Sequence, residues 1–430
     1  MSTHVAGLRE LRSVAGRLAA PAAVHEVELS APLPGFDEPG AASTSVLVRL
    51  HRKPLGTVVL PGGSVGADAL RAVVAAVLGP VIRAHLADDS MDGARSPSDD
   101  GVPPCGYERL FAAEPAPSLT VVIPTRERPA KLARLLDSIL AGTRRPLEIL
   151  VVDNSPVTDD VARLVDEHYA HRGVRRLVES SPGVSPTRNR GLAETLGETV
   201  AFVDDDVVVD RHWVAATLAA LMSASDAGCV TALVRPSELT TPAQVWLEQY
   251  AGFDKGYRRR AFRWDDRDAG RLHPFAAGSI GTGASMAFRT DVARRLGGFD
   301  PALGTGGPAR GGEDLDVILR VMQAGLAVVY DPAVLVWHEH RRDEASLRRA
   351  VYGYGIGLGA YLTKTVATRG MARHMLRQVP AGAHHFLAPT SAKNAARSGG
   401  NYPRALAPLE LIGLAYGPIA YARSRRALRR

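Results

Sequence analysis

Thr199-Val200-Ala201-Phe202-Val203-Asp204-Asp205-Asp206 is the stretch that decides the fold, because an apolar strand ends there in three adjacent carboxylates. Three like charges repel one another and are costly to bury in a core. In an open α/β sheet, the side chains that follow a strand project into the crevice where ligands bind. Carboxylates in such a crevice suit Mg²⁺ or Mn²⁺, and these ions suit a diphosphate. The alternative is an acidic loop that holds no metal.

The neighbouring sequence predicts which way the three carboxylates point and where others join them. Side chains alternate along a strand, so we expect Asp204 and Asp206 to share one face and Asp205 to point to the other. Asp153 ends another apolar strand, and parallel strands bring their carboxyl ends to one crevice. There Asp153 is suited to bind a nucleobase or ribose, although Asp-Asn-Ser-Pro is also turn chemistry. No G-x-G-x-x-G follows the first strand, which argues against dinucleotide cofactors.

Strands and helices alternate around this stretch, which favours a mostly parallel sheet with helices on both faces. The apolar patterns predict strands at 119–125, 148–153, 176–179, 199–203, 229–234, 285–288, 327–330 and 334–337. Helices are expected at 129–140, 161–169 and 186–196, and from Leu315. Before this region, 45–60 reads as a hairpin that turns at 53–56, and 67–86 reads as a helix. We therefore divide the chain into a small N-terminal α/β unit (1–87), a linker (88–117), a catalytic domain (118–340) and a basic, helical C-terminal region (341–430).

The composition of the 430 residues is that of an ordinary globular protein, with 46% hydrophobic and 23% charged residues. Two cysteines, Cys105 and Cys229, indicate a reducing compartment rather than a disulfide framework. We find no signal-peptide pattern and no run of about 18 uncharged apolar residues, so the prediction is a cytoplasmic protein.

The net charge of +7 is unevenly placed. Residues 341–430 contain sixteen Lys or Arg and three Asp or Glu. A nucleic-acid binder would carry its basic stripe on the main domain, so we expect no nucleic acid. The basic region instead suits an anionic membrane surface, such as the inner face of the cell membrane. A solvated helical tail is the other interpretation.

Candidate catalytic groups follow a glycine-rich loop and a late strand. Glu313 and Asp314 open the helix before Leu315, and a carboxylate there is a candidate general base, or simply an acidic first turn. His338 follows an apolar strand and Trp337, and neutral imidazole suits Mn²⁺. His340 is the alternate ligand. Arg188, near a helix N-terminus, is suited to pair with a phosphate or with a strand-end carboxylate.

From Leu119 to about His340 the chain resembles the inverting family 2 glycosyltransferases, which have the GT-A fold. The resemblance covers about half of the chain, and it depends on seven short motifs in order. They are Val121-Val122-Ile123-Pro124-Thr125, Val151-Val152-Asp153, Arg188-Asn189, Asp204-Asp205-Asp206, the stretch from Gly281 to Arg289, Gly297-Gly298-Phe299-Asp300 and Gly312-Glu313-Asp314. The late histidine is similar to that of galactofuranosyl- and rhamnosyl-type enzymes.

The resemblance implies a role for each matching residue. The expected donor-binding residues are Pro124, Thr125, Arg126, Asp153, Arg188, Asp204 and Asp205. The expected metal ligands are Asp204, Asp206 and His338, and the catalytic residues are Asp314, as base, and Glu313. Gly283 and Trp337 are expected to shape the sugar and acceptor pocket.

These expectations describe a Mn²⁺- or Mg²⁺-dependent inverting transferase. It would move a sugar from a nucleoside diphosphate sugar to a glycan, lipid-linked or small-molecule acceptor. Processive relatives carry Gln-x-x-Arg-Trp after the base, whereas Arg260-Ala261-Phe262-Arg263-Trp264 lacks the Gln and precedes it, so we expect non-processive transfer. A sugar-phosphate nucleotidyltransferase is the enzymatic alternative, but Ile123-Pro124-Thr125-Arg126 matches its signature poorly. A non-catalytic nucleotide-sugar binding protein is the other alternative, and donor turnover would exclude it.

Overall fold

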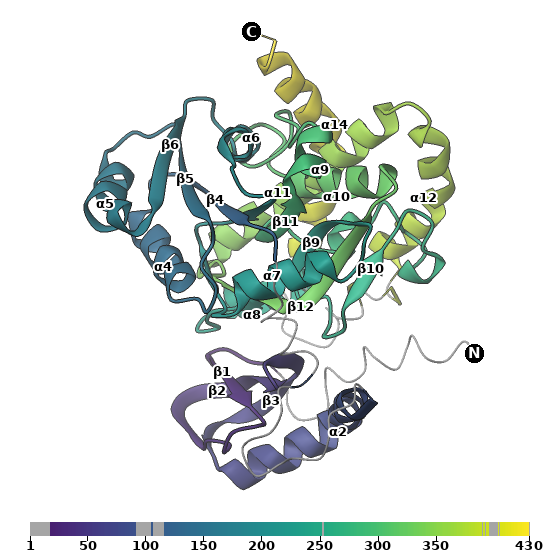
Figure 1. The fold of residues 1–430 in the computed structure, drawn as a ribbon. Coiled ribbons are helices and arrows are strands. Elements are labelled where there is room, and N and C mark those ends of the chain that lie inside the picture. The colour runs from purple at the N-terminus through teal and green to yellow at the C-terminus, as the bar shows by residue number, and fades with distance from the viewer. Residues whose placement is uncertain are drawn as a thin grey trace.

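The structure is a computed structural model that describes residues 18–91, 105, 116–251, 253–388, 390–391, 393–394, 403 and 405–429. Most of the expected linker, 88–117, lies outside these residues, as does the stretch before Leu18. The helix expected at 67–86 continues to Met91, inside the expected linker. Figure 1 shows a small N-terminal unit below a larger α/β domain, with helices of the C-terminal region packed against that domain.

A nine-stranded mixed sheet forms the centre of the large domain. Its strands run in the order β10 (Arg260–Phe262), β12 (Ala327–His338), β9 (Ala227–Pro236), β11 (Ser285–Arg289), β7 (Thr199–Val203), β4 (Leu119–Thr125), β5 (Glu148–Asn154) and β6 (Val174–Glu179), and β8 (Val207–Val209) pairs with β12. The pairs joining β7, β4, β5 and β6 are parallel, as are β9 and β12, while β11 and β10 run antiparallel to their partners. The expected mostly parallel sheet is confirmed.

Helices cover both faces of this sheet because successive strand residues point to opposite sides. In β4, Val121 and Ile123 join one apolar cluster, while Val122 joins the other. The first cluster lies under α4 (Pro129–Leu140), α5 (Asp160–His168) and α7 (Trp213–Met222). The second lies under α6 (Val184–Glu194), α9 (Thr290–Arg295) and α10 (Glu313–Gln323).

Two local predictions are wrong. The strands expected at 327–330 and 334–337 form one continuous strand, β12, with an irregularity between Asp331 and Leu335 where Pro332 lies. The hairpin of β2 (Phe36–Leu50) and β3 (Lys53–Val65) turns at His51 and Arg52, not at 53–56. Both turn residues have positive φ, 52° and 68°, and the Glu28 carboxylate accepts hydrogen bonds from both of their amides. This long-range cap replaces the Asn-Gly signal usual for such a turn.

The N-terminal unit consists of these two strands, β1 (Ala22–Glu28), which pairs parallel with β2, and α2 (Ala67–Met91). The span Ala67–Asp88 is long and apolar enough to cross a membrane by length and composition. Its residues Leu70, Val74, Val77 and Leu78, however, pack against the three-stranded sheet. The unit contacts the catalytic domain through an ion pair from Arg49 to Asp210 at 2.7 Å.

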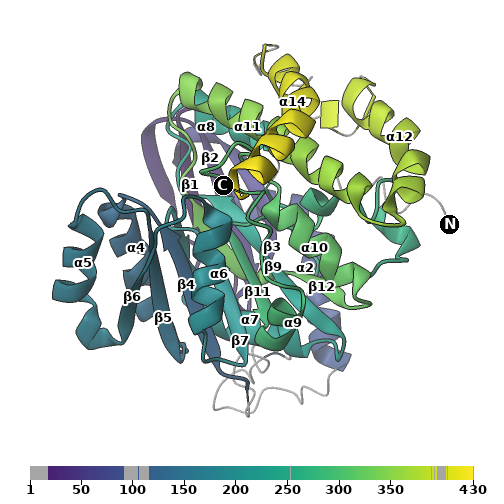
Figure 2. The ribbon, with the colours of Figure 1, turned by 90° about the horizontal axis from the view of Figure 1, so that it is seen from above.

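The C-terminal region is helical, as expected, but its first helix belongs to the catalytic domain. It contains α11 (Glu344–Ala367), α12 (Met371–Leu387) and α14 (Leu406–Ala427). Tyr361 of α11 is fully buried in the second apolar cluster of the sheet. Glycines allow α11 and α14 to cross closely, since a Cβ on Gly359 would lie 2.3 Å from the Leu414 carbonyl oxygen and one on Gly417 would lie 2.4 Å from Gly359 Cα. Figure 2 shows α12 and α14 on the same side of the domain.

Candidate active site

The three carboxylates after β7 lie at the carboxyl edge of the sheet, but they do not point as expected. The strand ends at Val203, and Asp205 and Asp206 form a turn. Asp205 accepts a hydrogen bond from Thr125 Oγ1 at 2.7 Å, and Arg128 Nη1 lies 3.1 Å from Asp205 and 3.5 Å from Asp206. The prediction that Asp205 points away from Asp206 is therefore wrong: both carboxylates contact Arg128, because a turn does not keep the alternation of a strand.

Arg188 connects Asp204 to the start of α10. Its guanidinium donates to Asp204 Oδ1 at 2.8 Å, to Glu313 Oε1 at 3.0 Å and to the carbonyl of Gly283 at 3.0 Å. The side chain is only 2% exposed and lies over the Phe299 ring. Of the two partners expected for Arg188, the structure shows the strand-end carboxylate. Because these hydrogen bonds occupy the Nη atoms of the guanidinium, few N–H donors remain to bind a phosphate.

Asp204 is the most open member of this network, with 34% of its side chain exposed. Burial raises its pKa to about 6; the charges of Asp206 and Asp205 add to this shift, and Arg188 opposes it. With a third of its side chain exposed, Asp204 is accessible to a ligand at the carboxyl edge of the sheet.

The three carboxylates of α10 differ in how many ion pairs and hydrogen bonds they make with other protein groups. Glu313 is buried against Arg188, and its pKa is raised by burial and by the charge of Asp314. Asp316 is buried and pairs with Arg320 and Lys364. Asp314 is half-buried, and it accepts the Gly283 amide at 2.8 Å. Since each carboxylate oxygen has two lone pairs, Asp314 retains capacity for an acceptor hydroxyl.

The loop before α10 fixes this carboxylate in place. Gly312 has φ 88°, and a Cβ there would lie 2.5 Å from the carbonyl oxygen of Gly357 on α11. Only glycine fits this close approach with a left-handed backbone. The loop also contacts the start of α6, where Val184 donates its amide to the Thr305 carbonyl. The two helices that carry Arg188 and Asp314 are thereby held together.

A chain of polar side chains leads from Asp206 into the interior. His338 Nε2 lies 3.5 Å from Asp206 Oδ1, and its Nδ1 lies 3.0 Å from Nδ1 of His340. His340 Nε2 in turn contacts Glu248 at 3.0 Å. Burial lowers the pKa of His338 to about 4, which the charge of Asp206 partly opposes, so the imidazole is neutral at physiological pH. His338 therefore lies beside Asp206, whereas His340 lies behind it, between His338 and Glu248.

Asp153 is fully buried at the end of β5. One of its carboxylate oxygens accepts two hydrogen bonds from Arg176, at 2.9 and 3.1 Å. The other, Oδ1, has no hydrogen-bond partner among the described residues. Burial raises the pKa of this group, and the pairing with Arg176 opposes the shift. A buried oxygen without a partner is a candidate for a ligand contact.

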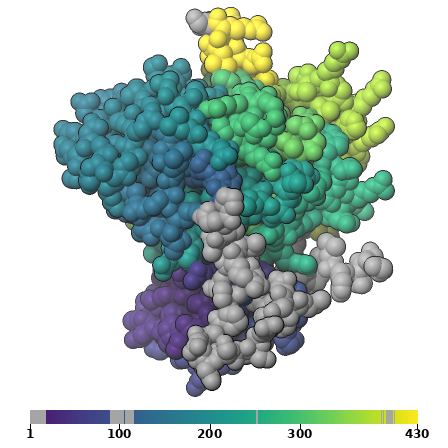
Figure 3. All heavy atoms as spheres, viewed as in Figure 1, coloured from purple at the N-terminus to yellow at the C-terminus, as the bar shows by residue number. Residues whose placement is uncertain are grey.

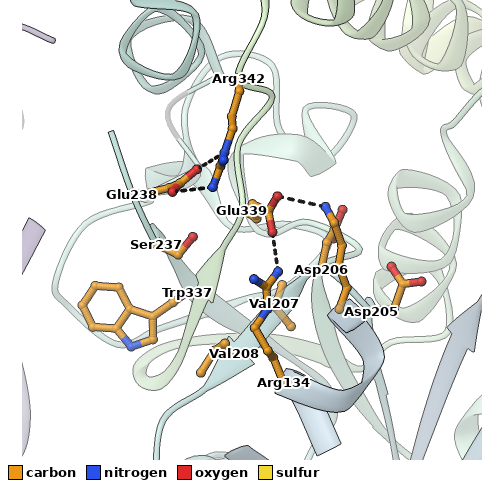
Figure 4. Close-up of a pocket in the computed structure, with 11 residues that line it drawn as sticks. Arg134, Asp205, Asp206, Val207, Val208, Ser237, Glu238, Trp337, Glu339 and Arg342 are labelled. Carbon is orange, nitrogen blue, oxygen red and sulfur yellow. Dashed lines mark hydrogen bonds and ion pairs between the residues drawn. The ribbon is translucent and has the colours of Figure 1, made fainter. Parts of the chain in front are cut away.

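A cavity of ≈ 180 Å³ lies beside Asp205 and Asp206, and Figure 4 shows it. Its lining includes Trp337, as well as Arg342 paired with Glu238 and Arg134 paired with Glu339. Gly283 is not among the lining residues but lies beside Asp314. The two residues expected to shape one pocket therefore occupy different parts of the site.

Several residues that line the site were missed from the sequence. Arg128 follows the expected Arg126, which is exposed and makes no ion pair with any described residue, and only the position of Arg128 after β4 could have revealed it. Arg341 is half-buried near Asp206 and His338, and the described part of the chain gives it no hydrogen-bond partner. Desolvation raises the pKa of Tyr354 to about 12, and nearby Asp206, Asp314 and Asp204 contribute. Because Tyr354 is 41% exposed, we place it at the mouth of the crevice.

Among curated proteins, the pre-mycofactocin glycosyltransferase of Mycobacterium tuberculosis (strain ATCC 25618 / H37Rv) is 31% identical over 242 residues, which is 55% of this chain and 46% of that protein. The glucosyl-dolichyl phosphate glucuronosyltransferase of Haloferax volcanii is 25% identical over 52% of this chain and 68% of its own length. The chain spans about half the length of the first of these relatives. Among solved structures, a mannosyltransferase from Pyrobaculum calidifontis in complex with GDP-Man and Mn²⁺ is 19% identical with a TM-score of 0.45, covering 81% of this chain and 95% of that chain.

A family model also matches the catalytic domain and the start of α11. The model described as "Glycosyltransferase like family 2" matches residues 115–351, more than half of the chain. The matched stretch contains all of the acidic groups of the candidate site, together with Arg188 and His338. The chain belongs to the family 2 glycosyltransferases.

Proposed function

We propose that this protein is a metal-dependent, inverting glycosyltransferase that uses a nucleoside diphosphate sugar and adds sugars without processive extension. The observation that best supports this proposal is a chain of hydrogen bonds. Arg188 donates to Asp204, at the carboxyl end of β7, and to the carbonyl of Gly283, whose amide donates to Asp314. This link supports a site in which Asp204 serves the donor diphosphate and Asp314 serves the acceptor.

The proposed metal ligands are Asp206 and His338, with Asp204 facing the same crevice. The carboxylate of Asp206 lies 3.5 Å from the imidazole of His338, whose low pKa leaves a lone pair free to bind a cation. Carboxylate and imidazole together suit Mn²⁺, and carboxylates suit Mg²⁺. When bound, such an ion neutralises the negative charge that develops on a leaving diphosphate.

The donor is proposed to lie along the edge of the sheet from Asp153 to Asp206. The unpartnered Oδ1 of Asp153 would accept a hydrogen bond from the nucleobase or ribose. Arg341, which is close to Asp206 and has no hydrogen-bond partner within the described residues, is suited to the diphosphate. Arg126 remains a second candidate for that role because it is exposed beside the same strand end.

Asp314 is proposed to accept the proton of the acceptor hydroxyl. As the acceptor oxygen bonds to the anomeric carbon, the bond from that carbon to the diphosphate oxygen breaks on the opposite face, which inverts the configuration. Glu313 is a poorer base because Arg188 already occupies it, and Asp316 is paired on its helix and with α11. Tyr354 and Gly283, one at the mouth and one beside Asp314, would border the sugar.

We also propose that the protein binds an anionic membrane through α12 and α14, where a lipid-linked acceptor would be met. Leu376, Val379 and Leu387 of α12 are 59–69% exposed and recur on one face of the helix. Exposed Arg373 and Arg377 flank them, and 368–388 contain no acidic residue. Apolar insertion and basic attraction reinforce each other at an anionic surface.

The proposed function is tested by measuring turnover of a panel of sugar nucleotides with Mn²⁺ or Mg²⁺, together with the shift in Tm that each donor causes. We expect one donor class to raise the Tm only when metal is present. We expect Asp206→Ala to abolish this metal-linked shift and leave the unliganded Tm nearly unchanged. Full turnover after exhaustive chelation would refute metal dependence, and product of retained configuration would refute inversion.

A further inference from the structure

His51, His85 and Cys105 form a cluster of metal-binding side chains that includes none of the carboxylates at the acidic edge of the sheet. Their nearest ligand atoms all lie within 4.8 Å of one another. His51 lies in the β2–β3 turn and His85 on α2, and Cys105 lies between α2 and β4 in the sequence. Among the described residues, this is the one group of three His, Cys, Asp or Glu side chains that meets this spacing. The catalytic site proposed above does not use it.

The spacing of the two histidines fits coordination of one ion. Nε2 of His85 lies 3.2 Å from Nδ1 of His51. Two imidazole nitrogens bound to one tetrahedral Zn²⁺ at about 2.0–2.1 Å would lie about 3.3 Å apart. In the absence of an ion, one ring has to donate a proton to the other at this distance. Replacing that proton with a cation needs little movement of either ring.

The chemistry of the third group selects the metal. A thiolate with two imidazoles is a softer ligand set than the carboxylates of the catalytic site, so it favours Zn²⁺ over Mg²⁺ or Mn²⁺. Cys105 is 5% exposed and His85 is 4% exposed, which limits access of water to the ion. Cys229, the other cysteine, is buried in β9 and does not belong to the cluster. Three protein ligands leave a fourth position for water.

We propose that His51, His85 and Cys105 bind one Zn²⁺ ion, which links Cys105 to the N-terminal unit. The ion would join the β2–β3 turn, α2 and Cys105. Zn²⁺ would displace the proton of the Cys105 thiol. An imidazole whose coordinating nitrogen carries a proton would shift it to its other ring nitrogen, so binding releases one proton. Because an unfolded chain has no such site, Zn²⁺ binding stabilises this arrangement.

The first test measures Zn²⁺ bound to the full chain after dialysis, in an Asp206→Ala background that removes the proposed catalytic metal site. We expect about one tightly bound zinc per chain. Cys105→Ser and His85→Gln should lower the affinity by at least about tenfold, since each removes a ligand. His25→Gln is the matched control, because His25 lies in the same unit but pairs with Glu38 outside the cluster. Equal zinc affinity in Cys105→Ser and the control would overturn the proposal.

A second measurement needs no substitution and so does not depend on the folding of a variant. Zn²⁺ should slow modification of Cys105 by a thiol reagent, and a chelator should restore the rate, as followed by mass spectrometry of the peptide. Co²⁺ in place of Zn²⁺ should show a thiolate-to-metal charge-transfer band that Cys105→Ser lacks. Modification of Cys105 at the same rate with and without Zn²⁺ would show that the two histidines are only a hydrogen-bonded pair.

Discussion

At the scale of single residues, the site depends on side chains that are hydrogen-bonded to other protein groups and so are held in place. Arg188 is the clearest case, because its hydrogen bonds to Asp204, Glu313 and Gly283 hold these groups in fixed positions relative to one another. The sequence identified Arg188 and the carboxylates but not which of them meet. A guanidinium reaches any of several acids near a strand end, and only tertiary packing decides among them. Residue types at strand ends are therefore predictable from sequence, whereas pairings across 95 to 125 residues are not.

Asp314→Asn should remove transfer and spare donor binding. The amide keeps the size of the carboxylate and its contact with the Gly283 amide, but it is not a base. Loss of a general base typically costs about 10² to 10⁴ in rate. Donor affinity should change little, because the proposed nucleotide and metal contacts lie elsewhere in the crevice. Steady-state kcat and the donor-dependent Tm shift, measured on one preparation, separate the two effects.

Glu313→Gln and Asp316→Asn are the matched comparisons for this assignment. Glu313→Gln is expected to weaken the hold on Arg188 and lower kcat less than Asp314→Asn does. Asp316→Asn is expected to act mainly on stability, because its partners are Arg320 and Lys364. Near-normal transfer by Asp314→Asn, with one of the other two inactive, would move the base to that residue.

Glu248→Gln should weaken metal affinity although Glu248 lies behind the site. Its carboxylate contacts His340, which fixes the orientation of His338 toward Asp206. Loss of such outer-shell support typically costs 10- to 100-fold in metal affinity. Calorimetric titration of Mn²⁺ into Glu248→Gln measures this loss. His338→Ala should lose more than His340→Ala does, and the reverse order would make His340 the ligand.

At the scale of elements, the sequence predicted β4 and β7 to the residue, since both are short, apolar and bounded by turn signals. It missed α7, whose ten residues are buried almost throughout and show no helical alternation of apolar and polar positions. It also missed that α11 packs into the catalytic domain. In the sequence, the glycines that permit this packing suggest a broken helix. The structure shows that they allow α11 to approach α14 and the start of α10 closely.

Gly312→Ala should destabilise the protein and lower kcat together. The added Cβ would meet the Gly357 carbonyl oxygen at 2.5 Å in a backbone with φ 88°. We expect a loss of roughly 2–3 kcal/mol in the free energy of unfolding, from the left-handed strain and the overpacking. Gly325→Ala is the matched control: its φ is also positive, 75°, but nothing lies within 4 Å of its Cβ. It should lose roughly 1 kcal/mol in chemical denaturation and keep kcat.

At the scale of the whole molecule, the N-terminal unit lies below the catalytic domain, and the end of α14 projects from the opposite side, where Figure 3 shows it in yellow. The catalytic crevice, the proposed zinc cluster and the basic helices therefore occupy separate regions of one chain. Composition set apart only the C-terminal region in the sequence, because the charge of 341–430 differs in sign from that of the rest. It overestimated the surface that is free for a membrane, since Val351, Ile356 and Tyr361 of α11 are buried.

If the exposed faces of α12 and α14 bind a membrane, the affinity for vesicles should depend on both the basic charges and the apolar side chains of these helices. Arg373→Gln with Arg377→Gln removes two basic charges near the surface, each worth about 1 kcal/mol on an anionic bilayer, so binding should weaken by roughly 30-fold. Leu376→Ser should weaken binding to the same vesicles by removing an apolar side chain that is 69% exposed. Arg71→Gln with Arg295→Gln is the control, because these arginines are also exposed but lie on α2 and α9. Co-sedimentation with phosphatidylserine-containing and neutral vesicles measures all four proteins. Equal absence of binding to both vesicle types would refute membrane association, because the basic and apolar groups of α12 then face only solvent.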